Sequence, residues 1–424
     1  MQKILFKILK LLARATLKRH RPDIVGITGS VGKSSTKEAV FNVLKTQFNV
    51  RQSQKNYNNE IGLPITILGC KPQGKSIIGW LVVIIKGVFL IIFKSRKYPK
   101  ILVLEMAADK PGDINYLLNI IPKNLIKVGI ITSISPSHLE AFKTVENVLA
   151  EKKQLLFGVR TNGWSIINGD SAYLDELKKD IRSKIMTYGY SQQADVMAKD
   201  IKFTEDNGIT CKLVTSSNVI PVQIPEAVGI HQLCAALAAA SVGIAYNITL
   251  VHISEALREC HPLPGRMRLL SGIKQTKIID DTYNSSPLAA LAAVKTLAHL
   301  KIEGAKWAVM GDMLELGGES EKEHRFLGRE IAKARINYLV VVGELARDIA
   351  RGARKIGMDK DHIFQFSDSS LAGRFIQDRL NKNDLLLIKG SQGARMEKIT
   401  KELMAEPLRA EELLVRHDKE WLKR

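Results

Sequence analysis

A short glycine-rich segment near the start of the chain has the residue types that bind phosphate. Residues 26–35 are Gly-Ile-Thr-Gly-Ser-Val-Gly-Lys-Ser-Ser, after an apolar run and before a helical pattern at 36–48. Backbone N–H groups of such a turn point at an anion, a lysine adds charge, and a serine hydroxyl can hold Mg²⁺. The common phosphate-loop spacing is not met, because Ile27 stands five positions before Gly32. The predicted phosphate-binding residues are Gly29, Ser30, Gly32, Lys33, Ser34 and Ser35.

The positive charge of the chain is concentrated in two segments. The 424 residues carry a formal net charge of +20, and residues 1–22 and 71–100 each contain seven Lys or Arg and no Asp or Glu. In both segments the cations alternate with large aliphatic residues rather than with aromatic residues that stack on bases. We therefore expect an anionic membrane surface as a partner and no nucleic acid.

The two basic segments have helical patterns. Residues 1–22 predict a basic amphipathic helix, and residues 77–93 are apolar except for Lys86. As a helix, 77–93 would reach about 25 Å, short of the ~30 Å hydrocarbon core. This favours shallow or re-entrant membrane association over a true span; alternatively the two segments cover each other or form an oligomer contact. With scattered cysteines and no signal peptide, we expect a cytoplasmic protein, peripheral on the inner face of the membrane.

The remaining chain alternates between strand-like and helical patterns. Strand-like runs at 24–27, 101–104, 128–131, 165–167 and 185–188 predict a parallel sheet, and 195–223 predicts an antiparallel excursion. A second series of strands and helices follows His-Pro-Leu-Pro-Gly at 261–265. We expect an α/β protein: a P-loop ATPase-like central domain at 23–261 with a hydrophobic insertion at 71–100, and a Rossmann-like α/β domain at 262–424.

Eight fragments together resemble one family. They are GITGSVGKSSTKEAV at 26–40, NYNNEIGLPITIL at 56–68, LEMAADKPGDINYL at 104–117, ITSISPSHLEAF at 131–142, PGRMR at 264–268, IDDTYNSSP at 279–287, GDMLELG at 311–317 and KGSQGARME at 389–397. They are similar to the Mur ligases of peptidoglycan synthesis, and most to the branch that adds D-Ala-D-Ala to a muramoyl-tripeptide. The resemblance implies ATP, two Mg²⁺ sites, and an acyl phosphate that an amine converts to an amide.

The resemblance also implies roles for individual residues. Lys33 and Ser34 serve the phosphates and the first Mg²⁺, and Glu105 and His138 are metal ligands. Lys152 matches a lysine that the family carbamylates with CO₂, although Lys153 is adjacent and the choice rests on the alignment. The implied catalytic residues are Lys33, Glu105, His138, Lys152 and Arg266. Taken singly, each of these residues has an ordinary structural explanation; their joint order and spacing favour the functional one.

The matches in the second half concern the nucleotide and the substrates. Arg266 matches an arginine that reaches the ATP phosphates, Asp281 a ribose ligand, and Asn284 a neighbour of the nucleotide. Gln232 stands where an adenine-contacting Asn is usual. The substrate-side matches are Asn58, Asn59, Glu60, Lys389, Ser391 and Arg395, the last three expected in a nest at a helix N-terminus.

The family begins with a UDP-binding domain, whereas here the phosphate loop starts at residue 26. A lipid-linked or polymeric acceptor, or a non-catalytic nucleotide-binding scaffold at the membrane, therefore stays open beside the UDP-linked substrate.

Overall fold

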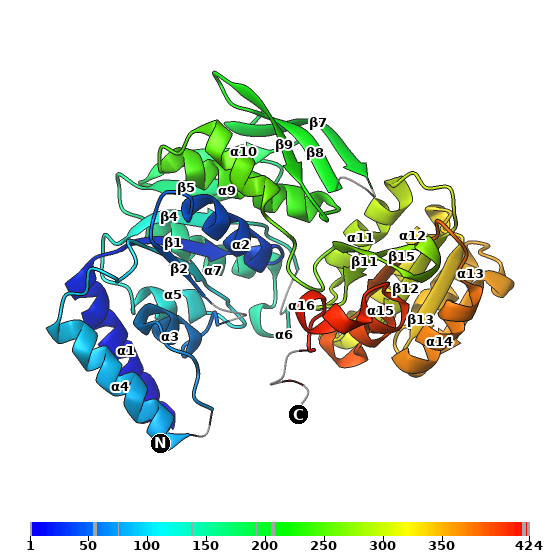
Figure 1. The fold of residues 1–424 in the computed structure, drawn as a ribbon, viewed down its shortest axis with the longest axis horizontal. Helices are drawn as coiled ribbons and strands as arrows, with labels where there is room; N and C mark the ends of the chain where they lie inside the picture. The colour runs from blue at the N-terminus through cyan, green and yellow to red at the C-terminus, as the bar shows by residue number, and fades with distance from the viewer. Residues whose placement is uncertain are drawn as a thin grey trace. The chain divides into compact units, whose positions relative to one another are not determined.

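The chain forms two compact units (Figure 1). The computed structural model describes residues 2–53, 57–74, 76–136, 139–191, 193–204, 208–417 and 421. The first unit comprises residues 1–200, 211–222 and 234–260, and the second comprises 201–210, 223–233 and 261–424. The second unit therefore includes two short segments that precede residue 261. The predicted domain boundary at 262 remains a proposal.

The larger sheet has the strand order β2-β3-β1-β4-β5-β6-β7-β8-β9 over the described residues. Its strands are β1 (Asp23–Thr28), β2 (Val50–Gln52), β3 (Ile101–Glu105), β4 (Ile126–Ile131), β5 (Trp164–Asn168), β6 (Lys184–Gly189), β7 (Val196–Thr204), β8 (Gly208–Val214) and β9 (Val219–Ile224). The pairs from β2 to β7 are parallel. The connections from β7 to β8 and from β8 to β9 are too short for a crossover, so these strands run antiparallel, as the alternating pattern predicts.

In a parallel sheet, the polar residues that follow the strands lie at the same edge of the sheet. β1 pairs with β3 on one side and β4 on the other, with Ile27 opposite Glu105 and Thr28 opposite Ile131. The phosphate loop, Glu105 and the segment after β4 therefore meet at the carboxyl ends of three neighbouring strands. Ligands bind at this edge in open α/β sheets.

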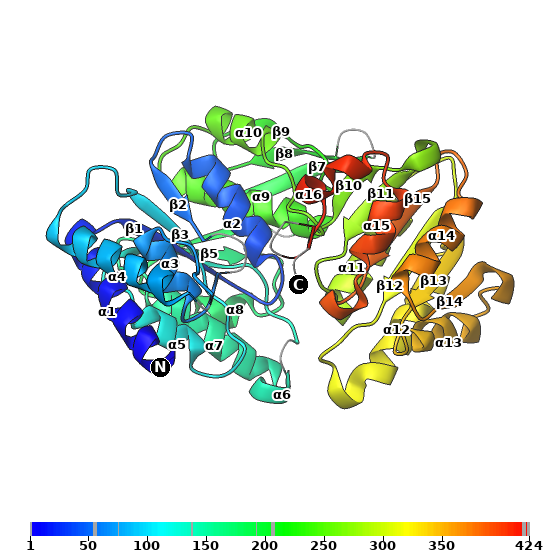
Figure 2. The same cartoon turned by 60° about the horizontal axis from the view of Figure 1, so that its bottom comes forward.

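Helices surround this sheet. They are α1 (Gln2–His20), α2 (Lys33–Leu44), α3 (Gly62–Leu68), α4 (Ile77–Ile92), α5 (Asp113–Leu118), α6 (Leu139–Phe142), α7 (Val145–Phe157), α8 (Leu174–Lys178), α9 (Ile230–Ala245) and α10 (Leu250–Arg258). α1 and α4 confirm the two helices predicted in the basic segments, and they lie side by side in both views (Figures 1 and 2).

The α1–α4 pair is fixed to the first unit by its inner face. Leu9, Leu68, Val83, Leu90 and Tyr98 form one buried cluster that joins α1, α3 and α4. Within the described chain, no helix combines the length and the apolar character needed to cross a membrane.

The second unit is built on a separate sheet of order β10-β11-β15-β12-β13-β14. Its strands are β10 (Arg268–Ser271), β11 (Lys277–Asp281), β12 (Lys306–Gly311), β13 (Tyr338–Val342), β14 (Ile363–Phe366) and β15 (Leu385–Lys389). Its helices are α11 (Pro287–His299), α12 (Ser320–Lys333), α13 (Arg347–Lys355), α14 (Ser369–Arg379), α15 (Glu397–Leu403) and α16 (Ala410–Leu413). β10 is antiparallel to β11 and the other pairs are parallel, as in a Rossmann-like domain.

Close approach of α12 and α13 depends on two glycines, which gives a test of the fold. A methyl group at Gly352 would overlap the main-chain oxygen of Arg325, and one at Gly328 would overlap that of Ile349. We expect Gly352→Ala to lower the free energy of unfolding of the second unit by roughly 1–3 kcal/mol, the usual cost of overpacking. Gly318, which has open space around it, provides the control Gly318→Ala. Equal thermal unfolding of the two variants would contradict this packing.

Candidate active site

The phosphate loop joins β1 to α2 and has two backbone positions that favour glycine. Gly29 has φ +150° and Gly32 has φ +87°, and a methyl group at Gly29 would overlap the hydroxyl of Thr132. The segment after β4 supports the loop: Ser133 Oγ accepts from the Val31 N–H at 2.9 Å, and Ser30 Oγ donates to the Ser135 carbonyl at 3.0 Å. The loop is therefore held in one shape by its neighbour.

The polar side chains of the loop point to the same end of the sheet. Lys33 Nζ donates to the Gly29 carbonyl at 2.7 Å, so the ammonium lies over the loop. Ser34 is buried at the start of α2, and its hydroxyl donates to Glu105 Oε1 at 3.3 Å. Ser35 is partly exposed. Ser34 and Glu105, each predicted separately as a metal ligand, are thus in contact with each other.

Glu105 is a buried carboxylate with three partners, two from α2 and one from the loop before α3. It is 2% exposed, and Asn58 Nδ2 donates to its Oε1 at 3.0 Å. Lys37 Nζ of α2 lies 3.7 Å from Oε2 and also donates to the Ser53 carbonyl at 2.7 Å. Oε2 itself accepts no hydrogen bond from the described residues. Since a buried carboxylate is costly unless compensated, this underused oxygen indicates a site for a cation.

The Ser34 and Glu105 oxygens suit Mg²⁺, which the family resemblance implies. Mg²⁺ prefers oxygen ligands and is usually held by one or two carboxylates together with substrate phosphates. Over the described residues there is no group of three His, Cys, Asp or Glu that could hold a metal alone. The first predicted Mg²⁺ site fits these residues, whereas His138, the predicted ligand of the second, lies outside the described residues.

Lys152 and Lys153 have different environments. Lys152 is 2% exposed on α7, and burial, with the nearby Lys33 charge adding to it, lowers the pKa of its ammonium to about 7. Lys153 Nζ instead donates to the main-chain carbonyl of Glu176 and lies over the Phe157 ring. The lowered pKa makes the neutral amine of Lys152 accessible near neutral pH. Burial also lowers the pKa of Lys153, but the amine of Lys153 has the Glu176 carbonyl as a partner.

The substrate-side residues of the first unit divide into separate roles. Asn58 contacts Glu105, as described, instead of standing free for a substrate. Asn59 Oδ1 accepts from the Gly62 N–H at 3.0 Å and so starts α3, and Glu60 is exposed.

The second unit has its own cluster of predicted residues at the ends of β11 and β15. Lys389 Nζ lies 2.6 Å from Asp281 Oδ2 and donates to the Asn284 carbonyl at 3.0 Å. Asp281 Oδ1 also accepts from the Met267 N–H at 3.2 Å. Lys389 thus pairs with the predicted ribose ligand. The segment after β15 forms a short 3₁₀ turn (Gln392–Ala394), and α15 begins at Glu397, so the anion nest of Lys389, Ser391 and Arg395 stays a prediction.

The remaining predicted residues of the second unit are also engaged. The Arg266 guanidinium lies 4.0 Å from the centre of the Tyr283 ring, and Gln232 Nε2 donates to the Arg266 carbonyl. The Ser391 hydroxyl accepts from the Leu314 N–H at 2.9 Å, and Arg395 pairs with Glu397.

Asp280 adjoins the predicted ribose ligand. It is fully buried and accepts from the Gly265 N–H at 2.8 Å and the Thr282 hydroxyl at 2.7 Å; burial raises its pKa to about 6.

Comparison with known proteins gives the family. Residues 27–78 and 87–243 match the Mur ligase middle domain, and residues 265–392 match the "Mur ligase, glutamate ligase domain". UDP-N-acetylmuramoyl-tripeptide–D-alanyl-D-alanine ligase of Buchnera aphidicola subsp. Baizongia pistaciae is 32% identical over 385 residues, covering 90% of this chain and 75% of the relative. The chain belongs to the Mur ligase family.

Other Mur ligases agree with this assignment. The ligase of the same description from Bacillus subtilis is 29% identical over 401 residues, covering 94% of this chain and 80% of the relative. The crystal structure of MurF ligase from Thermotoga maritima in complex with ADP matches with a TM-score of 0.76 and 27% identity, covering 94% of this chain and 83% of that one. The chain is accordingly an ATP-dependent ligase of the Mur type.

Two residues of this Mur ligase that the sequence analysis did not select contact the predicted site. Lys37 lies on the buried side of α2, one turn after Lys33. A lysine on the buried side of a predicted helix was the sequence feature that could have marked Lys37 as a site residue. Arg416 is buried near the end of the described chain, and its guanidinium donates to the carbonyls of Thr282 and Tyr283. Arg416 also pairs with Glu397 at 3.0 Å. No local pattern marks its contacts with Thr282 and Tyr283, because those residues are more than a hundred positions away in the sequence.

The Lys37–Glu105 contact predicts a specific defect. Lys37→Met keeps the apolar stem and removes the charge that orients Glu105. We expect the apparent Mg²⁺ constant of the ATPase and ligase activity to rise at least about tenfold, as for other partners of metal ligands. Lys45→Met, at the exposed end of the same helix, is the control. An unchanged Mg²⁺ titration for Lys37→Met would mean that Lys37 does not position the carboxylate.

Proposed function

We propose that this Mur ligase adds D-alanyl-D-alanine to a muramoyl-tripeptide, with ATP converted to ADP and phosphate. The observation that carries the proposal is the cluster at one sheet edge: a phosphate loop, a buried carboxylate whose Oε2 accepts no hydrogen bond from the described residues, and a buried lysine of lowered pKa. The relatives from Buchnera aphidicola and Bacillus subtilis are named for this reaction.

The reaction has two steps. The tripeptide carboxylate attacks the γ-phosphorus, the bond to the β-phosphate oxygen breaks, and ADP leaves with that electron pair. The amine of D-alanyl-D-alanine then attacks the acyl carbon, phosphate leaves, and the amine loses a proton to form the amide. Phosphoryl transfer of this kind depends on positioning and charge neutralisation more than on covalent help. Mg²⁺, when bound, supplies positive charge next to the transferred phosphoryl group.

The residues of the first unit have defined parts in this scheme. The N–H groups around Gly32 and the Lys33 ammonium bind the β- and γ-phosphates. Ser34 and Glu105 hold the first Mg²⁺, and His138 is proposed as a ligand of a second. Asn58 and Lys37 keep the Glu105 carboxylate in place.

We assign the carbamylated position to Lys152. Its neutral amine attacks CO₂ and loses a proton, and the product is an anionic carbamate in place of a cation. This removes the repulsion between Lys152 and Lys33 and creates oxygen ligands for a metal. Burial excludes water from the carbamate, which slows its hydrolysis.

In the second unit, Asp281 is proposed as the ribose ligand and Arg266 as a phosphate ligand. The Asn284 carbonyl accepts a hydrogen bond from Lys389, and Gln232 donates one to the Arg266 carbonyl. We assign Asn284 and Gln232 to the nucleotide. Asp281 then exchanges its Lys389 partner for a ribose hydroxyl, leaving Lys389 to meet an anionic group together with Ser391 and Arg395. Asn59 and Glu60 are assigned to the muramoyl-peptide.

A lipid-linked muramoyl-peptide is the second candidate acceptor, and the apolar outer face of α4 favours it. A non-catalytic scaffold is disfavoured. Burying a lysine beside a phosphate loop costs free energy, and a protein that catalyses no reaction does not require that arrangement.

We further infer that the protein is cytoplasmic and peripheral on the inner face of the membrane. The basic, apolar α1 and α4 are the observation that supports this location.

Direct assay tests the substrate pair. We expect phosphate release from ATP and Mg²⁺ with UDP-muramoyl-tripeptide that depends on D-alanyl-D-alanine, and a pentapeptide product in mass spectra. The matched reaction without dipeptide is the control. Phosphate release no higher than in this control, with a lipid-linked acceptor active in the same assay, would replace the UDP-linked substrate by the second candidate.

The assignment of Lys152 makes a second prediction. Lys152→Ala is expected to abolish turnover without rescue by bicarbonate, whereas Lys153→Ala keeps most of it. In wild-type enzyme at limiting CO₂, activity should fall as the pH drops below about 7, because the protonated amine cannot attack CO₂. Carbamate formation on enzyme given ¹³CO₂ is measurable by NMR. Full activity of Lys152→Ala would exclude the carbamate.

A further inference from the structure

The outer face of α4 is an apolar surface along the whole helix. Ile78, Leu81, Ile85, Val88, Phe89 and Ile92 recur at helical spacing and are all exposed, with Ile78 at 77% and Ile85 at 60%. The buried residues Val83, Gly87 and Leu90 lie on the opposite side of the helix and pack toward α1. Contiguous apolar surface of this extent marks an interaction site.

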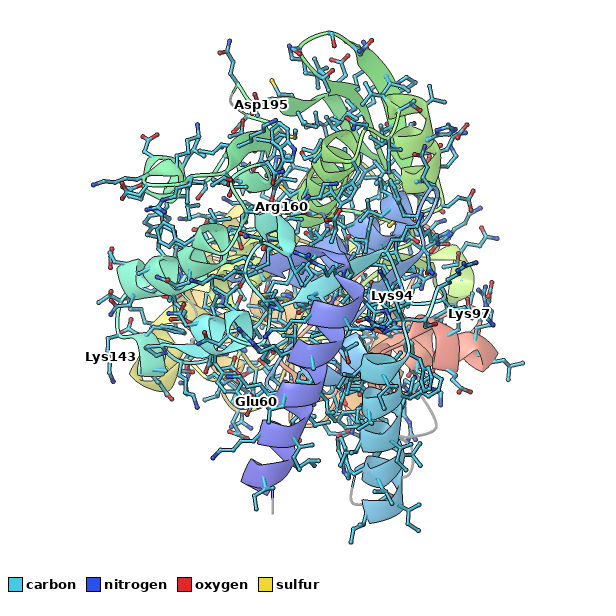
Figure 3. The ribbon with its side chains drawn as sticks, turned by 90° about the vertical axis from the view of Figure 1, so that its left-hand side faces the viewer. Glu60, Lys94, Lys97, Lys143, Arg160 and Asp195 are labelled. Atoms are coloured by element: carbon cyan, nitrogen blue, oxygen red, sulfur yellow. The ribbon has the colours of Figure 1, made fainter. Side chains whose placement is uncertain are left out.

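The helix is held rigidly, so this surface has a fixed orientation. Gly87 packs against Leu12 of α1, and His20 Nε2 donates to the Leu90 carbonyl at 2.9 Å. These contacts make α1 and α4 run in the same direction, and both helices stand at the front of Figure 3. The surface is therefore a feature of the folded protein and does not depend on a helix forming at the partner.

The charges around α4 select the partner. Lys94, Arg96, Lys97 and Lys100 follow its C-terminal end and are exposed, and Lys94 and Lys97 lie beside that end in Figure 3. Residues 1–22 and 71–100 contain no acidic residue. A two-fold dimer through this face would bring two copies of the segment 71–100 together, each with seven Lys or Arg and no Asp or Glu to pair with them. An anionic surface with an apolar interior satisfies both the cations and the apolar residues.

We propose that the outer face of α4 docks on an anionic phospholipid bilayer, with the helix lying in the interface. This inference rests on the proposed peripheral location. It adds that α4 is the helix that contacts the membrane, that its outer face is the side buried there, and that anionic lipid is preferred. At about 24 Å, 16 residues are too short to cross the hydrocarbon core, and the polar ends of α4 are at the same depth when the helix lies flat. The family match skips residues 79–86, inside α4, so Leu81 and Ile85 of this surface lie outside the matched residues.

Docking fixes the active-site edge relative to the membrane. α3 packs on both α1 and α4 through Leu68 and Leu63, and Asn59 caps its start. The next residue back, Asn58, holds Glu105. A docked enzyme therefore presents the loop at 57–60 at a set orientation to substrates that arrive on or near the bilayer.

Flotation of the full chain with vesicles tests the proposal. Wild-type protein should float with vesicles of phosphatidylglycerol and phosphatidylcholine, and much less with phosphatidylcholine alone or at high salt. Ile85→Gln/Phe89→Gln should reduce partitioning at least about tenfold, because two exposed apolar anchors are lost. Val251→Gln/Leu371→Gln alters two comparably exposed apolar residues elsewhere and should float like wild type.

A second variant and two further measurements keep the outcomes separate. Lys94→Glu/Lys97→Glu should lose binding to anionic vesicles even if the first variant folds poorly. Equal flotation of wild type and both α4-region variants would overturn the proposal. A wild-type dimer that Ile85→Gln/Phe89→Gln converts to monomer would show a second copy as the occupant and also overturn it. Ligase activity without vesicles should be unchanged in both variants; activity absent in all proteins, wild type included, would count against the proposed function instead.

Discussion

Compensation of the buried Glu105 carboxylate is the constraint on which the arrangement of the first unit depends. A carboxylate at 2% exposure is stable only with donors and positive charge nearby, and here they come from α2 and the loop before α3. Glu105 Oε2, which accepts no hydrogen bond from the described residues, is where we propose that Mg²⁺ adds further positive charge. Glu105 is the last residue of β3. The end of β3, the start of α2 and the loop before α3 must therefore lie together for Ser34, Lys37 and Asn58 to contact this carboxylate. The same arrangement places the phosphate loop at that edge of the sheet.

Lys152 imposes a second, opposite constraint at the same edge. Burial, with the nearby Lys33 charge adding to it, lowers the pKa of Lys152 to about 7. The neutral amine is the form that the chemistry proposed for Lys152 requires. The phosphates of a nucleotide and a carbamate would add negative charge near Lys33, and Mg²⁺ would add positive charge near Glu105. The site is therefore electrostatically incomplete as a protein alone, as expected of one that assembles around ATP.

Local patterns predicted much of this and failed where partners are distant in sequence. The phosphate loop, the parallel strands, α1 and α4 were predictable because each has a spacing signature over a few residues. β2 was not among the predicted strands, since it is three residues long and is defined by its neighbour β3 in the sheet. Lys37 and Arg416 gain their roles from contacts with Glu105 and Thr282, which only the folded chain brings near. The Asp281–Lys389 ion pair likewise joins two residues that were assigned separately to nucleotide and substrate.

We propose that the cluster around Glu105 and Lys152 activates a carboxylate as an acyl phosphate. The most direct measurement uses muramoyl-tripeptide labelled with ¹⁸O in its terminal carboxylate and follows the label by mass spectrometry of the released phosphate. We expect each turnover to transfer one ¹⁸O atom from the carboxylate to phosphate, since that oxygen bridges carbon and phosphorus in the intermediate. Amide formation with unlabelled phosphate would contradict it.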